Sequence, residues 1–262
     1  MSPAGPPSRA VAAGYTAAVI HGVATGVYYA VQKDLLRDTQ VIPLNWLQMF
    51  VMGAWAGGII LWRRAWSPTR GEPADLVPPV YPFLLLFSLI ASVLFFGRNA
   101  GVQLTTATTG VVIVRLEIAF TLLLSYLVLR QRVRLPAWLG IGGMVLGAFL
   151  VSRVSAAGFG WEPSGILLLV LAAVGIAVNA LIIKTKFSQV PNELVIVYSA
   201  TVQFVLYGLA TFITGQQEAV RELLASPSRA FEAAAGGLLI GITLFSYYYS
   251  MKRIPMWAAR VL

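Results

Sequence analysis

The sequence contains no cysteine among its 262 residues, and it has one histidine and ten acidic residues. Without cysteine there is no disulfide framework, no thiolate chemistry and no cysteine-based metal site. The single histidine, His21, cannot build a metal site alone, and no nucleophile–base or metal-spaced cluster is present. A Gly-x-x-x-x-Gly-Lys-Ser/Thr loop is missing as well, which argues against ATP-driven transport. We therefore expect no enzymatic activity, no metal and no cofactor.

Charged residues are scarce too. They make up 11% of the chain, whereas about 25% is usual in soluble domains, and apolar residues make up 58% with a mean hydropathy of +0.78. The apolar residues form runs of roughly 20, the length that crosses a ~30 Å hydrocarbon core as a helix. The net charge of +9 comes from Lys and Arg at the ends of these runs, not on a basic face. The pattern predicts an integral membrane protein surrounded by lipid and no binding of nucleic acid.

Eight apolar runs are long enough to be complete transmembrane helices, and helices are expected because a spanning segment must satisfy its own backbone hydrogen bonds. Counting Lys and Arg outside the spans places eleven on the side of the N-terminus and six, including Lys33 and Arg98, on the other. This excess predicts a cytoplasmic N-terminus. The eight predicted spans are residues 11–32, 43–62, 78–97, 107–129, 136–154, 164–184, 194–214 and 231–251.

Four of the spans carry the pattern Gly-x-x-x-Gly. Small residues at this spacing let helix backbones approach closely and gain packing contacts in lipid. We interpret these motifs as packing sites inside one bundle, and the alternative is a face that forms a homodimer. The four pairs are Gly22/Gly26, Gly53/Gly57, Gly143/Gly147 and Gly237/Gly241.

The two ends of the chain are weakly similar to each other. A shift of about 151 residues aligns Lys33 with Lys184, and a shift of about 150 aligns Gln103 with Arg253. Sequence identity is low, and the matching feature is the order of spans, loops and turns. We interpret the two lysines as anchors at the membrane ends of their helices.

The repeat divides the chain into residues 1–155 and residues 156–262. Five spans per unit is an odd number, so the second unit would be inverted relative to the first, as in secondary transporters that bind substrate near the midplane. The predicted fold is an all-α integral membrane protein, a 5+5 inverted-repeat helical bundle with about eight complete transmembrane helices. Because the second unit would lack most of its fourth helix and all of its fifth, we expect a truncated ten-helix protein. A natural eight-helix form is the alternative.

The stretch TTATTGVVIVRLEIAFTLLLSYLVLRQRVRLPAWLGIGGMVLGAFLV, residues 105–151, resembles the end of the first repeat in the drug/metabolite transporter superfamily, in particular its EamA-like branch. A helix entered through a small-residue turn ends at the basic element that begins with Arg130, and a Gly-rich helix with Trp138 follows. The sequence departs from the family pattern in three places. Gln131 replaces an acidic residue, Glu117 lies where the fourth helix often has proline, and His21 replaces a frequent tryptophan.

The resemblance implies the 5+5 inverted repeat and the movement of small metabolites across a membrane, often outward. It also implies a location in the bacterial inner membrane. It does not identify the metabolite, because the shared motifs are loose patterns of small and apolar residues.

Glu117 is the only carboxylate near the middle of an apolar run. A charge at that depth costs from about 3 to more than about 10 kcal/mol, so it normally faces a partner or a wet cavity. With Thr121 and Ser125 it makes one polar stripe that we interpret as a cavity lining. Glu117 would then bind a cationic group or exchange a proton, because low dielectric favours the neutral carboxyl. The alternative is an ion pair with a neighbouring helix.

Arg115 lies about 200° from Glu117 around an ideal helix, so we expect no ion pair between the two. Three roles remain open for its guanidinium. It contacts an anionic group of the substrate, extends toward the membrane surface, or bonds to carbonyls of an adjoining helix.

Six uncharged or weakly basic residues complete the predicted pathway for substrate and proton. His21 shares a helix face with Thr25 and Tyr28, as a proton-sensitive cavity residue or a packing histidine. Asn179 and Gln203 lie at mid-span depth and contact substrate or bond between helices. Tyr247–Tyr249 either form an interface belt or face inward, and Tyr248 is our candidate for the site. The repeat places Tyr248 and Tyr249 opposite Arg98 and Asn99. The full set is Glu117, Arg115, His21, Tyr28, Asn179, Gln203, Tyr248 and Asn99.

These observations predict a secondary transporter that moves a small metabolite, such as an amino acid or drug-like solute, by alternating access. Export is the expected direction, and proton coupling through Glu117 is the expected energy source. The alternatives are a non-transporting membrane subunit or inactive fragment, and an integral membrane enzyme.

Overall fold

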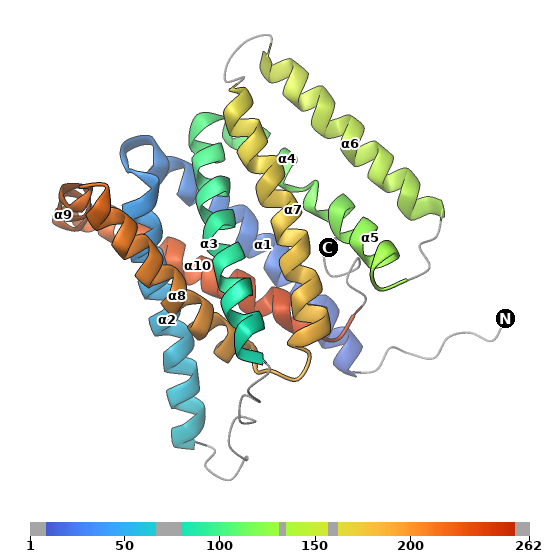
Figure 1. Cartoon of the computed structure of the whole chain (residues 1–262), viewed down its shortest axis with the longest axis horizontal. Coiled ribbons are helices and arrows are strands. Elements are labelled where there is room, and N and C mark those ends of the chain that lie inside the picture. The colour runs from blue at the N-terminus through green and yellow to red at the C-terminus, as the bar shows by residue number, and fades with distance from the viewer. Residues whose placement is uncertain (1–8, 67–79, 131–134, 157–161, 255–262) are drawn as a thin grey trace.

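The computed structural model describes residues 9–66, 80–130, 135–156 and 162–254, and within these ranges the chain is helical and contains no strand. Figure 1 shows the helices gathered into one bundle, with α6 along one edge. The helices are α1 (Arg9–Asp38), α2 (Val41–Trp66), α3 (Tyr81–Leu104), α4 (Ala107–Val114), α5 (Glu117–Leu127), α6 (Leu135–Ala156), α7 (Pro163–Lys186), α8 (Asn192–Ile213), α9 (Gln217–Ala225) and α10 (Pro227–Met251).

The predicted all-α membrane fold is confirmed. Seven helical segments are long and apolar enough to cross a membrane, namely α1, α2, α3, the segment Thr108–Leu127 that includes α4 and α5, α7, α8 and α10. The remaining predicted span coincides with α6, whose part Trp138–Gly147 is a shorter apolar helix. The chain is thus a multi-pass membrane protein.

The fourth predicted span is not one continuous α-helix. Between α4 and α5, the Leu116 N–H donates to the Ile113 carbonyl at 3.0 Å and the Ile118 N–H donates to the Arg115 carbonyl at 3.0 Å. Such i→i+3 bonds define a 3₁₀ turn with about three residues per turn, tighter than an α-helix. Residues 115 and 117 are therefore about 120° apart by the shorter way round, instead of about 160°.

Three long helix pairs build the bundle, α1 with α10, α3 with α7, and α2 with α8. Each pair joins a helix that precedes residue 155 to one that follows it, so the two halves of the chain interleave (Figure 1). Further contacts join α10 to α2, α3 to α8, and both α4 and α5 to α7. Interleaving places helices of both halves around the centre of the bundle.

The Gly-x-x-x-Gly prediction holds for only part of the motifs. A Cβ built on Gly237 would lie 2.8 Å from the Gln48 carbonyl oxygen of α2, and one on Gly241 would lie 2.7 Å from the Trp55 ring. Gly53 similarly meets Ala200 of α8 at 3.2 Å. Within the described residues nothing lies within 4 Å of such a Cβ at Gly26, Gly57, Gly143 or Gly147, so close packing there was predicted wrongly.

Lys33 and Lys184, which we interpret from the sequence as membrane-end anchors, also bond to the ends of neighbouring helices. The Lys33 ammonium donates to the carbonyls of Val102 and Thr105, at 2.8 and 2.7 Å, where α3 ends. The Lys184 ammonium donates to the carbonyl of Met251 at 2.7 Å, where α10 ends. The last carbonyls of a helix lack intrahelical partners and carry partial negative charge. Each lysine therefore caps a helix that follows it in the chain.

We predict that Lys33→Met and Lys184→Met each lower the free energy of unfolding by about 1–2 kcal/mol, because hydrogen bonds from a charged donor to helix-end carbonyls are lost. Lysine-to-arginine changes should lose less. Thermal unfolding in detergent measures the effect. The matched control is Lys186→Met, since that exposed ammonium lies 4.6 Å from the centre of the Phe83 ring instead of on a helix end. Equal losses at all three lysines would contradict the capping role.

Candidate functional site

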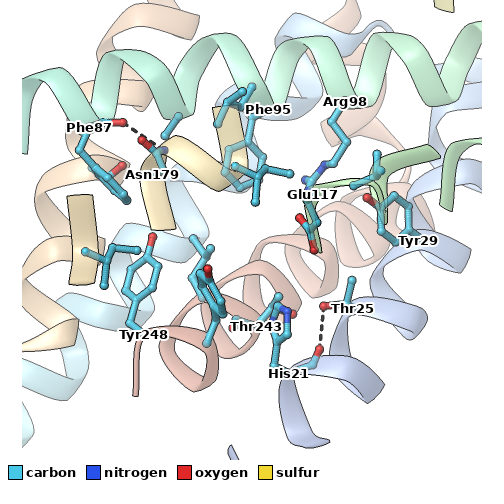
Figure 2. A pocket seen from close by; sticks show the side chains of 18 of the residues that line it. His21, Thr25, Tyr29, Phe87, Phe95, Arg98, Glu117, Asn179, Thr243 and Tyr248 are labelled. Carbon is cyan, nitrogen blue, oxygen red and sulfur yellow. Dashed lines mark hydrogen bonds between the residues drawn. The ribbon is translucent and has the colours of Figure 1, made fainter. Parts of the chain in front are cut away.

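One cavity lies at the centre of the bundle and encloses about 830 Å³ of space not filled by protein atoms, including the part that opens to the outside. Its wall is built by α1, α3, α4, α5, α7, α8 and α10. Helices of both halves of the chain therefore face the same space, as Figure 2 shows. From the sequence we also expect the segment after Pro255 to contribute to this site, but that segment lies outside the described residues.

Six of the eight predicted site residues line this cavity, and two do not. Tyr28 and Asn99 are both buried, at 2% and 1% exposure, behind the wall formed by α1 and α3. Thr121 and Ser125 are buried as well, but of the predicted polar stripe only Glu117 reaches the cavity. The six that line it are Glu117, Arg115, His21, Asn179, Gln203 and Tyr248.

Arg115 and Glu117 form an ion pair, with Nη1 and Oε1 4.0 Å apart, contrary to our expectation from an ideal helix. The 3₁₀ turn between α4 and α5 explains the difference, because it rotates the two side chains toward each other. Glu117 is 4% exposed and its carboxylate points into the cavity (Figure 2). A buried carboxylate next to a guanidinium remains charged at a lower cost than an isolated one.

His21 joins α1 to α10 at the cavity wall. Its Nδ1 lies 3.1 Å from the Thr243 carbonyl oxygen, and its ring centre lies 5.1 Å from that of Tyr247. The neighbouring Thr25 hydroxyl donates to the His21 carbonyl at 2.6 Å, as Figure 2 shows. His21 thus both packs between helices and faces the cavity, so the two interpretations of this residue are compatible.

Two amide side chains belong to the cavity lining. The Asn179 Nδ2 donates to the Phe87 carbonyl at 3.5 Å, and the Gln203 Nε2 donates to the Ser199 hydroxyl at 2.9 Å. The Oδ1 of Asn179 and the Oε1 of Gln203 are buried and have no hydrogen-bond partner among the described residues. Because a buried polar atom without a partner is costly, these oxygens are candidate acceptors for a ligand or for water.

Arg98 is the principal cavity residue that the sequence analysis missed. The predicted third span ended at residue 97, so Arg98 was counted as a loop residue, but α3 continues to Leu104. Its guanidinium lines the cavity, and its Nη2 donates to the Tyr28 hydroxyl at 2.7 Å. The sequence did contain a signal for this. Apolar residues resume at Ala100 to Val102 after the polar pair Arg98-Asn99, which indicates that the helix continues past residue 97 with the polar pair on a buried face.

Tyr28 and Asn99 belong to a buried network that supports Arg98 from behind. The Tyr28 hydroxyl donates to the Asn99 Oδ1 at 3.3 Å, and the Asn99 Nδ2 donates to the Asn45 Oδ1 at 2.6 Å. The network joins α1, α2 and α3. The two residues predicted to contact substrate therefore lie next to a cavity residue rather than at the cavity surface.

The cavity wall opposite the charged residues is aromatic and aliphatic. Phe87 and Tyr248 meet with ring centres 6.1 Å apart, and Tyr247 and Tyr248 are each 3% exposed inside the bundle. An interface belt is therefore excluded for these two tyrosines. Tyr249 does not line the cavity and stacks on Arg253 with 3.4 Å between its ring centre and Cζ. The cavity combines a charged end with a largely apolar wall.

The described residues contain no group of three or more His, Asp or Glu side chains that would hold a metal ion. The polar atoms of the cavity are thus guanidinium, carboxylate, imidazole, hydroxyl and amide groups. They can bind an organic solute by hydrogen bonds and charge.

Comparisons with known proteins agree with this architecture. A solved structure titled "Crystal structure of protein" matches 98% of this chain and 86% of its own chain, with a TM-score of 0.64 and 20% sequence identity. At that identity the match shows the fold alone. No curated protein matches the chain. The model of the EamA-like transporter family matches residues 12–153, which is more than half of the sequence. The chain therefore belongs to the EamA-like transporter family of the drug/metabolite transporter superfamily, a family of membrane transporters.

Proposed function

We propose that this protein is a secondary transporter that carries a small organic solute across the bacterial inner membrane by alternating access. Its N-terminus lies in the cytoplasm, and residues 1–155 and 156–262 act as two inverted units. The observation that carries the proposal is the central cavity, whose wall is supplied by helices of both units. A site between two units opens to either side when the units rock against each other.

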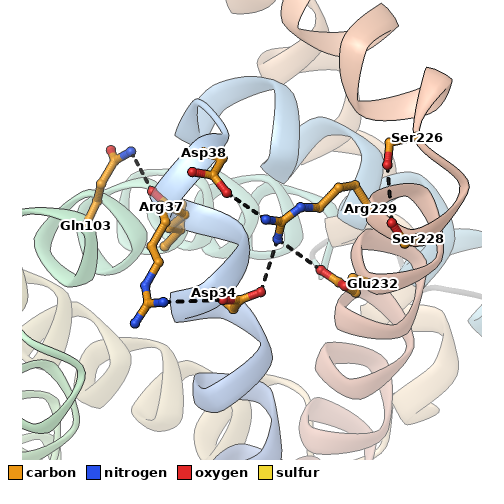
Figure 3. A network of polar contacts seen from close by, with 9 residues as sticks. Asp34, Arg37, Asp38, Gln103, Ser226, Ser228, Arg229 and Glu232 are labelled. Atoms are coloured by element: carbon orange, nitrogen blue, oxygen red, sulfur yellow. Dashed lines mark hydrogen bonds and ion pairs between the residues drawn. The ribbon is translucent and has the colours of Figure 1, made fainter.

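Ion pairs join the two proposed units at both ends of α2. At one end, Arg63 of α2 pairs with Glu193 at the start of α8. Near the other, Arg229 of α10 pairs with Asp34 at 3.1 Å and with Asp38 at 2.6 Å, both near the end of α1 (Figure 3). About 22 residues of helix, or roughly 33 Å, separate Arg63 from the start of α2.

These contacts suit a carrier that opens at one end at a time. Asp34 and Asp38 are exposed, and an exposed ion pair contributes only roughly 0–1 kcal/mol, so the Arg229 contacts break without a large barrier. We assign the Arg63 and Arg229 pairs to the closed state of the two ends. The solute is a metabolite, amino acid or drug-like compound of a size that fits the cavity. Export is the direction that the family resemblance favours, and Glu117 is the proton-coupling group.

The absence of cysteine allows a direct test of alternating access that requires no knowledge of the solute. Ser199 lines the cavity and is 3% exposed, so Ser199→Cys introduces a single thiol there. In reconstituted vesicles we expect a membrane-impermeant maleimide to modify this thiol when added to either side. The rate should be slow, because each opening is transient.

Val205→Cys is the matched control, because Val205 belongs to the same helix but is 51% exposed on the outside of the bundle. A thiol facing lipid should remain unmodified from both sides. Modification of Ser199→Cys from one side alone would contradict alternating access and would favour a static pocket in a non-transporting subunit.

A further inference from the structure

We propose that Arg98 is the binding residue for an anionic group of the solute, and that the substrate class is an organic anion with an apolar or aromatic body. The inference rests on the proposed function, because it assigns chemistry to the cavity of that transporter. It concerns a residue that no motif identified.

The charges in the cavity do not balance without a ligand. Arg98 and Arg115 are both cationic, and Glu117 is the one carboxylate that the described residues contribute to the wall. Arg115 is paired with that carboxylate, whereas no described carboxylate lies within ion-pair distance, 4.0 Å, of Arg98. Arg98 is half-buried within a membrane helix, and a guanidinium at this depth without an anionic partner is costly. A ligand carboxylate supplies the missing charge.

The surroundings of Arg98 hold its guanidinium in place. Its Cζ lies 4.4 Å from the centre of the Phe95 ring and 4.7 Å from that of Tyr28. The Tyr28 hydroxyl accepts from one nitrogen, and the Asn99 and Asn45 amides hold that tyrosine. A guanidinium held by two aromatic faces and a hydrogen bond loses little further freedom when a ligand binds.

One donor of Arg98 has no partner within the described protein. Guanidinium has five N–H donors in a planar fork that matches a carboxylate. Its Nε is buried and has no hydrogen-bond partner among the described residues. Figure 2 shows the side chain extending from α3 into the cavity where Glu117 and Tyr29 also point. A purely structural arginine at this depth would be expected to have its donors satisfied by the protein.

The rest of the cavity indicates the body of the solute. From Arg98 the wall follows α3 to Phe87, a distance of about 16 Å at about 1.5 Å per residue. The Phe87 and Tyr248 rings and the side chain of Ile183 line this end. A ligand with its anionic group at Arg98 therefore places an apolar or aromatic body against these rings.

The test uses three probes of nearly equal shape, namely indole-3-acetate, indole-3-acetamide and tryptamine. Binding to the purified full chain in detergent is measured by equilibrium dialysis with radiolabelled probes. We expect indole-3-acetate to bind about ten- to a hundredfold more tightly than its amide, because a charge-assisted pair is gained. Tryptamine should bind most weakly. Binding of acetate and amide with equal affinity, or of none of the three, would overturn the proposal.

Three variants of the site test whether Arg98 causes the preference. Arg98→Gln should remove the preference for the acetate over the amide, and Arg98→Lys should retain part of it. Tyr28→Phe keeps the ring but removes the hydroxyl that positions Arg98, so it should weaken acetate binding by a few-fold. If Arg98→Gln does not yield a monodisperse protein, Tyr28→Phe and Arg98→Lys decide the question. An unchanged preference in both would overturn the assignment.

Arg253→Gln is the matched control, because Arg253 also stacks on a tyrosine ring but lies outside the cavity lining. It should leave the preference for the acetate unchanged.

The cysteine experiment and the binding experiment distinguish a wrong substrate class from a protein that does not transport. If Ser199→Cys is modified from both sides while the acetate shows no preference, the carrier stands and its substrate is not an organic anion. If the preference is present but modification is one-sided, the site binds anions without transport.

Discussion

Glu117→Gln is expected to abolish stimulation of transport by a pH gradient while leaving solute binding largely intact. Glutamine keeps the size and hydrogen-bonding capacity of the neutral carboxyl but cannot exchange a proton. Glu117 is 4% exposed, lines the cavity and pairs with Arg115, so its protonation changes the charge that a solute meets. The measurement is solute flux in reconstituted vesicles with and without an imposed pH gradient.

The same cavity holds other groups that influence Glu117, namely Arg98, Arg115, His21 and Tyr29. His21→Gln therefore belongs in the experiment, because a pH response that disappears only in that variant would move the proton-coupling role from Glu117 to His21. Glu222→Gln is the control, since that carboxylate is exposed on α9. A pH response that persists in Glu117→Gln would remove Glu117 from proton coupling.

Gly237→Ala is expected to lower the free energy of unfolding by about 1–3 kcal/mol, the usual cost of overpacking. Its Cβ would lie 2.8 Å from the Gln48 carbonyl oxygen and 2.9 Å from the Val51 Cβ. The first of these is a backbone atom that cannot rotate away, so α10 and α2 would have to separate. The gain in helix propensity from glycine to alanine, about 1 kcal/mol, is smaller. Thermal unfolding in detergent measures the net effect.

Gly57→Ala provides the comparison, because Gly57 belongs to the same kind of motif on α2 but nothing lies within 4 Å of its built Cβ in the described chain. That variant should be neutral or slightly more stable. Equal behaviour of the two variants would show that the α2–α10 contact does not depend on the absence of a side chain at Gly237.

The membrane fold follows directly from the order of residues. Apolar runs of about 20 residues must become helices in a bilayer, because no water is present to satisfy their backbone groups. The charge of Glu117 inside such a run likewise indicates a polar environment, since isolated charge in lipid is too costly. These conclusions depend only on composition, length and solvent, so sequence alone suffices for them.

Other features depend on which helices face each other. Hydropathy ended the third span at residue 97, but Arg98 remains inside α3 because its surroundings are Tyr28 and Phe95 rather than lipid. The sequence predicts Lys33 as a membrane-end anchor, and the structure adds that it caps the end of α3. A polar side chain at the end of a span can lie at the membrane surface or bond to a neighbouring helix. Only the tertiary structure shows which groups surround it.

Departures from ideal helix geometry also could not be predicted from the sequence. The sequence identified Arg115 and Glu117, but ideal helical periodicity separated them, and only the 3₁₀ turn brings them into an ion pair. Gly237 and Gly57 lie in the same kind of motif, and only helix packing shows that one supports a close contact and the other does not. Apolar runs in a bilayer are thus sufficient to determine the class of fold and the buried carboxylate of this protein. The partners of Arg98, Lys33 and Glu117 were decided by tertiary structure, because each interaction joins groups whose approach depends on how the helices bend and pack.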